Sequence, residues 1–349
     1  MAQIRPFRGV LYNSRQIQDF ARVVSEPYDV INSGQQEDYY RLHPYNIIRL
    51  ILGKRYPGDN DKNNQYTRAD KFFRDWQKQG VLRRDEKEYL YLYEQTFLHN
   101  HKRKRRSGFI ILLKLEDFAK NTILPHENTF SRPVTDRLEL LKTVRANLSP
   151  IFALFSDPQE KTNKLISSYK KSHRPYIALE KDGIWHKLWR LGDKQKIAAL
   201  KKLLKNKQIF IADGHHRYEA ALTYRNQMLK KQGPAPGAAF NYVMTYLVAT
   251  NDPGLAILPT HRALKLKRRW PTAELWRGLK QAFLARKFSS PDQLFAYLAR
   301  RGRTKGVFGA YFGQRRFWGL RLKNHRRLQS LGGRAWQKFA PAFGCDNPA

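Results

Sequence analysis

Hydrophobic and polar positions along this chain follow two different periods. Between residues 66 and 79 apolar side chains recur every three or four positions, which predicts a helix with one buried face. Residues 88–98 and 107–116 are rich in β-branched and aromatic side chains and predict a hairpin joined by the cationic segment HNHKRKRR. The run NIIRLIL after Pro44 predicts a further buried strand.

Predicted helices and strands alternate along the rest of the chain without a regular β-α-β rhythm. A buried strand at residues 208–212 runs directly into a helix, and two basic helices, 272–286 and 290–301, precede a short pair of strands. This mixture favours an α+β fold, a mixed sheet with surrounding helices, over a doubly wound sheet. We expect an α+β core over residues 1–264, a small basic α/β subdomain over residues 265–322 and a divergent basic tail over residues 323–349.

Composition excludes several classes of protein. Hydrophobic residues make up 41% of the 349 positions, which is enough for a buried core and argues against global disorder. The single cysteine, Cys345, excludes a disulfide within the chain and a cysteine-based zinc site, and it favours a reducing compartment. Neither an apolar leader nor an apolar run of membrane-spanning length is apparent, so we expect a cytoplasmic protein without membrane partners.

The charge is strongly positive. Subtracting 29 acidic from 66 basic side chains gives a formal net charge of +37. Such an excess attracts polyanions, so non-specific binding of nucleic acid is expected on charge alone. Basic residues are nevertheless spread over every segment, as a genome-wide compositional bias would also produce, and both interpretations stay open.

The sharpest chemical constellation is the segment IFIADGHHRYEAAL. A buried strand leads into Asp213 and Gly214 at a helix start, where free N–H groups and the helix dipole favour an anion. His215, His216 and Arg217 then place three donors around that point, which resembles a phosphate cradle in outline. The alternative is an ordinary strand-to-helix junction with Asp213 as its N-cap.

Three further polar clusters lie in apolar surroundings. In SEPYDVI, Glu26 and Asp29 flank a Pro-Tyr kink, which suits a general base or a Mg2+ ligand, or alternatively an ordinary turn. The segment LPHENTF, which is followed by Arg137, suggests substrate contacts, or alternatively a solvated loop. The segment LPTHRAL also suggests substrate contacts, or alternatively an ion pair at the end of a strand. The candidate substrate-binding residues of these two segments are His126, Glu127, Thr129, Arg137, His261 and Arg262.

Familiar nucleotide and metal motifs are missing from the sequence. It has no GxxxxGK[ST], no GxGxxG after a strand, no GxSxG and no kinase signature, so a nucleotide must be bound by another device. Adjacent histidines on a helix diverge, and the spacing fixes no third ligand, so we expect no metal cluster made by the protein alone.

The order of these motifs resembles a known family. RPFRGVLYN, SEPYDVI, HPYNIIRLIL, LPHENTF, IADGHHRYEAAL and ILPTHRAL resemble the prokaryotic family catalogued as domain of unknown function 1015, strongly over residues 4–264 and weakly to about 322. The DGHHR element is similar to the box shared by ParB-type proteins, sulfiredoxin and the free-serine kinases. That resemblance implies a ParB/sulfiredoxin-like core around the strand, DGHHR and the helix.

The resemblance also implies an activity. By likeness to the free-serine kinases we expect a small-molecule phosphotransferase that uses ATP or ADP with Mg2+, with phosphates at Gly214 to Arg217. Glu26, Asp29 and Asp213 would be its catalytic carboxylates, and Asp213 would also be a Mg2+ ligand. The acceptor would be serine or another small hydroxyl metabolite. One alternative is a non-catalytic ParB-like protein that binds nucleotides or nucleic acid. The other is an inactive truncated paralogue, because the sequence after residue 323 departs from the family. The oligomeric state stays open.

Overall fold

The computed structural model describes residues 1–127, 129–258, 261, 263, 272–301 and 306–323. The chain divides into two compact units, residues 1–256 and 257–349. The boundary that we expected after residue 264 falls outside the described residues. No helix in the described part is long and apolar enough to cross a membrane.

The first unit is built on a nine-stranded mixed sheet. Pairs β6–β10 and β7–β11 are parallel and the other pairs are antiparallel, so the predicted α+β class with a mixed sheet is confirmed. Across the sheet the order is β6 (Ile123–Leu124), β10 (Ile209–Asp213), β7 (Ile151–Phe155), β11 (Tyr242–Ala249), β5 (Lys102–Lys114), β4 (Leu90–His99), β9 (Ile184–Leu191) and β8 (Ile177–Lys181), with β1 (Ile4–Arg5) also pairing with β5. Strands β2 (Val10–Tyr12) and β3 (Leu82–Arg84) form a separate pair.

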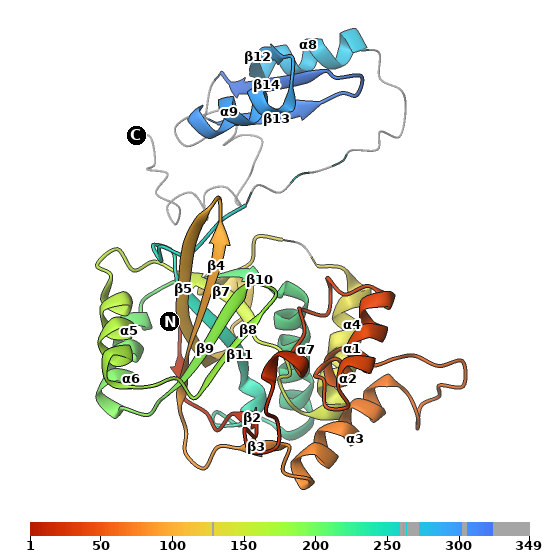
Figure 1. The fold of residues 1–349 in the computed structure, drawn as a ribbon, viewed down its shortest axis with the longest axis vertical. Coiled ribbons are helices and arrows are strands. Elements are labelled where there is room, and N and C mark those ends of the chain that lie inside the picture. Colours follow the sequence, from red (N-terminus) through yellow and green to blue (C-terminus); the bar gives the residue numbers. More distant parts are fainter. Residues whose placement is uncertain (128, 259–260, 262, 264–271, 302–305, 324–349) are drawn as a thin grey trace. The chain divides into compact units, whose positions relative to one another are not determined.

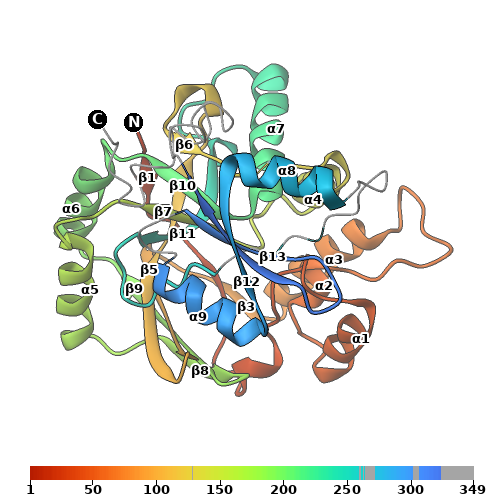
Figure 2. The ribbon, with the colours of Figure 1, turned by 90° about the horizontal axis from the view of Figure 1, so that it is seen from above.

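Helices lie at both sides of this sheet in Figures 1 and 2: α5 and α6 at one side, and α7 with α4 at the other. The main apolar cluster joins strand residues to side chains of α5, α6 and α7, and a second cluster centred on Trp76 holds the N-terminal segment together. The helices of the first unit are α1 (Ser33–Leu42), α2 (Ile48–Ile51), α3 (Gln65–Lys78), α4 (Ser131–Val144), α5 (Lys161–Ser172), α6 (Lys194–Leu204) and α7 (His215–Gln232).

The predicted hairpin is present, but its cationic segment is not the turn. Strands β4 and β5 are joined by Asn100 and His101 alone, with φ of 49° and 59°. Two consecutive left-handed residues match the right-handed twist of the flanking strands, which favours so tight a turn. The basic run from Lys102 onward therefore belongs to β5, where its side chains alternate between the two faces of the sheet.

The predicted strand at NIIRLIL is wrong, because Ile48–Ile51 is helix α2. Buried Asn46 starts this turn: its side chain accepts a hydrogen bond from the Ile48 N–H at 3.0 Å and donates to the Arg22 carbonyl at 2.7 Å. Ile48, Leu50 and Ile51 are all buried. A short apolar run that is buried on all sides carries no period, so the sequence pattern cannot distinguish a helix from a strand there.

The second unit contains α8 (Thr272–Ala282), α9 (Pro291–Arg301) and a three-stranded antiparallel sheet in the order β12 (Phe283–Phe288), β14 (Phe317–Leu322) and β13 (Val307–Tyr311). The helix expected through residue 286 ends at Ala282, because Phe283 onward pairs with β14 and becomes β12. The short β pair that we predicted is confirmed as β13 and β14.

Candidate functional site

The junction between β10 and α7 is the centre of the candidate site. Gly214 has φ +88°, a conformation that L side chains rarely adopt, and an added Cβ would lie 2.9 Å from Arg217 Nη2. Gly214 occupies the N-cap position, so Asp213 is not the N-cap. Among the described residues, no side chain accepts a hydrogen bond from the first-turn amides of α7.

Arg217 folds back over this junction. Its Nη2 lies 2.5 Å from Asp213 Oδ2, its Nη1 donates to the Pro150 carbonyl, and its Nε is buried with no hydrogen-bond partner among the described residues. The arginine side chain is 12% exposed and that of Asp213 is 52% exposed. The guanidinium is thus fixed against Gly214, with Asp213 as its counter-charge.

His215 is buried and contributes no positive charge at neutral pH. Burial, followed by the neighbouring charge of His126, lowers the pKa of His215 to about 4. Its Nε2 accepts the backbone N–H of His126 at 3.3 Å, so in the neutral ring Nδ1 carries the proton and faces Glu127 Oε2 at 3.8 Å. This histidine can offer a hydrogen bond to an anion, but not a charge.

The LPHENTF segment packs directly on the start of α7, although about 90 residues separate the two in sequence. His126 Nδ1 shares a hydrogen bond of 2.7 Å with the Ile211 carbonyl, and since a carbonyl only accepts, Nδ1 carries the proton. The Phe130 N–H donates to His216 Nε2 at 3.3 Å. These two bonds bring both histidine-bearing motifs together; Asn128 lies outside the described residues.

Glu219 is a member of this cluster that the motif analysis missed. It lies one helical turn after His215, and its carboxylate accepts a hydrogen bond from the Thr129 hydroxyl. The spacing of four residues from His215 places the two side chains on one face of the helix, and this was the only signal in the sequence that pointed to Glu219.

A second group of predicted residues lies on α4 and in the SEPYDVI segment, where Arg137 contacts Tyr28. Arg137 is 9% exposed, donates to the Ile51 carbonyl at 2.8 Å and lies 3.8 Å from the centre of the Tyr28 ring. Burial raises the pKa of Tyr28, and the charges of Arg137, Asp29 and Arg217 also act on it. Tyr28, the neighbour of Asp29, is therefore near enough to Arg217 for the arginine's charge to act on its hydroxyl.

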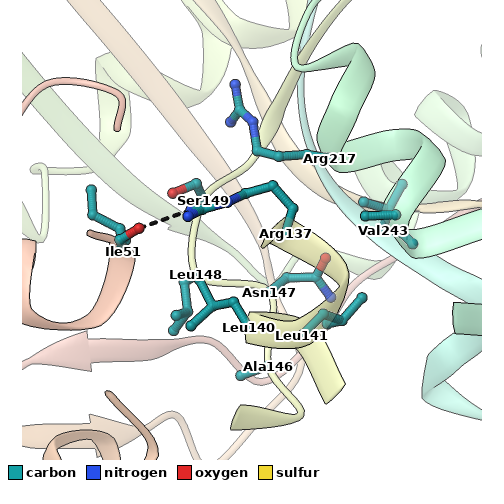
Figure 3. Close-up of a pocket in the computed structure, with 12 residues that line it drawn as sticks. Ile51, Arg137, Leu140, Leu141, Ala146, Asn147, Leu148, Ser149, Arg217 and Val243 are labelled. Carbon is teal, nitrogen blue, oxygen red and sulfur yellow. Dashed lines mark hydrogen bonds between the residues drawn. The ribbon is translucent and has the colours of Figure 1, made fainter. Parts of the chain in front are cut away.

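Arg137 and Arg217 border a small cavity between α4 and α7 of about 50 Å³. In Figure 3 the Arg137 guanidinium reaches toward Ile51, while Arg217 extends from α7. Asn147 and Ser149 add polar groups to a lining that is otherwise largely apolar. The volume is far below the roughly 300–1,000 Å³ typical of ligand pockets, so this cavity does not enclose a nucleotide.

The two upstream carboxylates differ in their surroundings. Glu26 is half-buried and accepts a hydrogen bond from the Tyr39 hydroxyl, whose pKa is raised first by burial. Asp29 is exposed beside Tyr28. His261 is exposed and belongs to the second unit, and Arg262 lies outside the described residues, so the role of LPTHRAL in substrate binding stays a prediction.

Among the described residues, no three His, Cys, Asp or Glu side chains gather closely enough to hold a metal ion. Asp213 is a single exposed carboxylate, and Arg217 already neutralises it. A Mg2+ ion at this junction would therefore need the oxygens of a bound ligand as its main partners.

The fold and the site together define an α+β protein with a mixed sheet, in which a buried strand passes through a left-handed glycine into a long helix. One model of a known protein family matches nearly the whole chain. The chain belongs to the family described as protein of unknown function (DUF1015), which matches residues 4–338. The match extends past residue 322, where the resemblance of the motifs ended. Searches of the curated proteins and of the solved structures found no match.

Proposed function

We propose that the β10–α7 junction binds the phosphates of ATP or ADP, and that the protein transfers a phosphoryl group to a small hydroxyl metabolite such as serine. The observation that carries this proposal is the uncapped start of α7 after Gly214, with Arg217 held against it. Free amides, the helix dipole and a fixed guanidinium stabilise a phosphate without moving during the reaction. The likeness of DGHHR to the ParB/sulfiredoxin-like superfamily supports the same assignment.

Two carboxylates have separate roles in the transfer step of this proposal. The hydroxyl oxygen of the acceptor attacks the terminal phosphorus, the bond to the leaving phosphate breaks, and the hydroxyl proton passes to a carboxylate. We assign that carboxylate to Asp29, because the charge of Arg217 acts on the adjacent Tyr28, whereas Glu26 already accepts a hydrogen bond from Tyr39. Mg2+ bound to the phosphates would supply charge neutralisation, and Asp213 would be its ligand from the protein.

His126 and Glu127 are placed in this proposal as contacts to the acceptor. His126 is held through Nδ1 by Ile211, which leaves Nε2 oriented toward Glu127 Oε1 at 3.6 Å. Both side chains are substantially exposed, at 42% and 63%, so a small polar molecule can reach them.

The test is a transfer assay with radiolabelled ATP or ADP, Mg2+ and a panel of hydroxyl metabolites. We expect transfer to one acceptor class, and a loss of at least tenfold in Asp213→Asn. Asp117→Asn is the matched control, since Asp117 pairs with Arg225 of the same helix at 3.1 Å with the same exposures of 52% and 12%. Absence of transfer from either donor to every acceptor would reject the kinase assignment.

A second candidate is a ParB-like protein that binds nucleotides or nucleic acid without turnover. The feature that favours it is the run of five consecutive basic residues on β5, of which Lys102, Arg103 and Arg105 are exposed. Retention on DNA of a preferred sequence above about 200 mM salt would support this candidate. If the protein no longer stays bound to any DNA at that salt concentration, its DNA binding is only the non-specific electrostatic attraction that counterion release explains.

A further inference from the structure

A row of aromatic side chains begins beside Asp213 and crosses the nine-stranded sheet. Phe152 on β7 is the cross-strand partner of Asp213, and Tyr246 on β11 is the partner of Phe152. Partners of this kind point to the same face of a sheet. The next residues along these strands, Ala153 and Leu247, point to the other face and belong to the main apolar cluster. The row therefore lies on the face that is turned away from that cluster.

The row continues over the neighbouring strands. The ring of Tyr246 stacks on Phe152 with centroids 5.4 Å apart and extends over Gly108 of β5, where an added Cβ would lie 2.9 Å from a ring carbon. Tyr93 of β4, the partner of Gly108, meets Tyr246 edge-on at 5.1 Å. The Tyr93 hydroxyl shares a hydrogen bond of 2.6 Å with His186 Nδ1 on β9. Four rings thus form one continuous surface.

Arg106 places a positive charge on this surface. It lies two positions before Gly108 on β5 and so shares its face, with the guanidinium carbon 4.8 Å from the centre of the Phe152 ring and 5.8 Å from that of Tyr246. One end of the guanidinium donates to Gln95. Contact with two aromatic faces and a bond to Gln95 fix the plane of this group.

Arg106 forms no direct ion pair in the described part of the chain, and its Nε is buried with no hydrogen-bond partner there. Asp252 is near enough for Arg106 to act on its pKa, which burial raises. Its carboxylate, however, already accepts the N–H groups of Ser107 at 3.3 Å and Gly254 at 2.8 Å. A buried donor on a charged group without a partner is uncommon and calls for an explanation.

We infer that Arg106 binds an oxyanion of the ligand, a phosphate or a carboxylate, over the Phe152 ring next to the junction at Asp213. This inference rests on the proposed function, because it extends the same site by one strand toward β5. Gln95 and the Tyr93 hydroxyl supply uncharged hydrogen-bonding groups around the anion. Phe152 and Arg106 are half-buried, so a ligand can reach both. Such a planar guanidinium can meet either oxyanion with two parallel N–H donors.

The experiment measures ligand binding by the full chain with isothermal titration calorimetry. One arm uses pyrophosphate with Mg2+, and the other uses glycerate, a short hydroxy acid that carries a carboxylate and no phosphate. Each is titrated into the unaltered protein, Arg106→Gln, Arg106→Lys and Arg103→Gln. Arg103 is the matched control, since it is exposed on the same strand and points to the opposite face.

We expect Arg106→Gln to raise the Kd of one probe about tenfold or more, which is the usual range for a lost charge-assisted hydrogen bond, and Arg103→Gln to change it less than twofold. Weaker pyrophosphate binding would assign the oxyanion to a phosphate, and weaker glycerate binding would assign it to the carboxylate of the acceptor. If Arg106→Gln does not fold, Arg106→Lys replaces it, because lysine keeps the charge and loses the planar fork.

Unchanged affinity for both probes in the folded Arg106 variants would overturn the inference, and so would an unaltered protein that binds neither probe. The proposed function is judged separately by phosphoryl transfer and its loss in Asp213→Asn. Transfer that survives in Arg106→Gln with unchanged probe affinities would thus reject the role of Arg106 and leave the kinase assignment standing.

Discussion

Replacing Gly214 by alanine tests whether Arg217 really lies across the start of α7. An alanine at φ +88° is strained, at a cost of about 1–2 kcal/mol for a left-handed L residue. Its Cβ would also lie 2.9 Å from Arg217 Nη2 and 3.0 Å from Cζ, so the guanidinium must move. Moving it weakens the half-exposed pair with Asp213, worth up to about 1 kcal/mol, and the more buried bond to the Pro150 carbonyl, worth about 1–2 kcal/mol.

The sum predicts that Gly214→Ala lowers the free energy of unfolding by about 2–5 kcal/mol. Gly183→Ala is the matched control: Gly183 has φ +76°, and its added Cβ meets no atom within 4 Å, so the control carries the strain of about 1–2 kcal/mol without the collision. Hydrogen exchange of the β10 amides, measured by mass spectrometry, reports the stability of the first unit alone. Equal losses in the two variants would refute the position that we assign to Arg217.

Three further predictions concern α7 and the start of β5. Tyr218→Phe should destabilise the first unit by about 2–3 kcal/mol, because the fully buried hydroxyl donates to the Glu116 carbonyl at 2.7 Å and accepts the Glu116 N–H at 3.0 Å; an unchanged urea midpoint would contradict this. The pKa of His215 is about 4 in the folded protein and about 6.5 in the unfolded chain, so the unfolded state binds the proton first as the pH falls. The free energy of unfolding should therefore decrease by about 3 kcal/mol between pH 6.5 and pH 4. His215→Gln should flatten that pH dependence, and identical slopes in urea titrations would show that His215 is not the cause. Arg103→Gln combined with Arg105→Gln should reduce the salt dependence of DNA retention by about two units of slope, measured by filter binding, whereas an unchanged slope would exclude the exposed basic residues of β5 as the contact.

The parts of the fold that the sequence predicted correctly are those with a local cause. The helix at Gln65–Lys78 has an apolar face at a spacing of three to four, and Asn64 caps it through its side chain. The β4–β5 hairpin has two long runs of strand-forming residues. The passage from a buried strand through Gly214 into a helix was predicted from the local pattern, and the structure adds that this glycine is left-handed.

The parts that the sequence did not predict depend on partners distant along the chain. The pattern gave no indication of α5 or of the β8–β9 hairpin, which are held in place by the core and by β4. The charge state of His215 depends on its burial against His126, 89 residues away. The pattern predicted three donors around a phosphate, whereas in the structure one of them is a neutral ring and another is already paired with Asp213.

The same distinction explains why the sequence pattern places Arg106 in a turn. From the sequence, a run of five basic residues between two strands is typical of a solvated loop, and nothing local separates Arg106 from Arg105. Register separates them: β5 begins at Lys102, so alternate residues face opposite sides, and Arg106 falls on the side of Phe152 and Tyr246. One signal was present, since a glycine inside an apolar strand often marks a close approach, and at Gly108 the atoms that approach include the Tyr246 ring. A glycine in the middle of a strand can therefore indicate which residues of a neighbouring basic run share a face with a functional site.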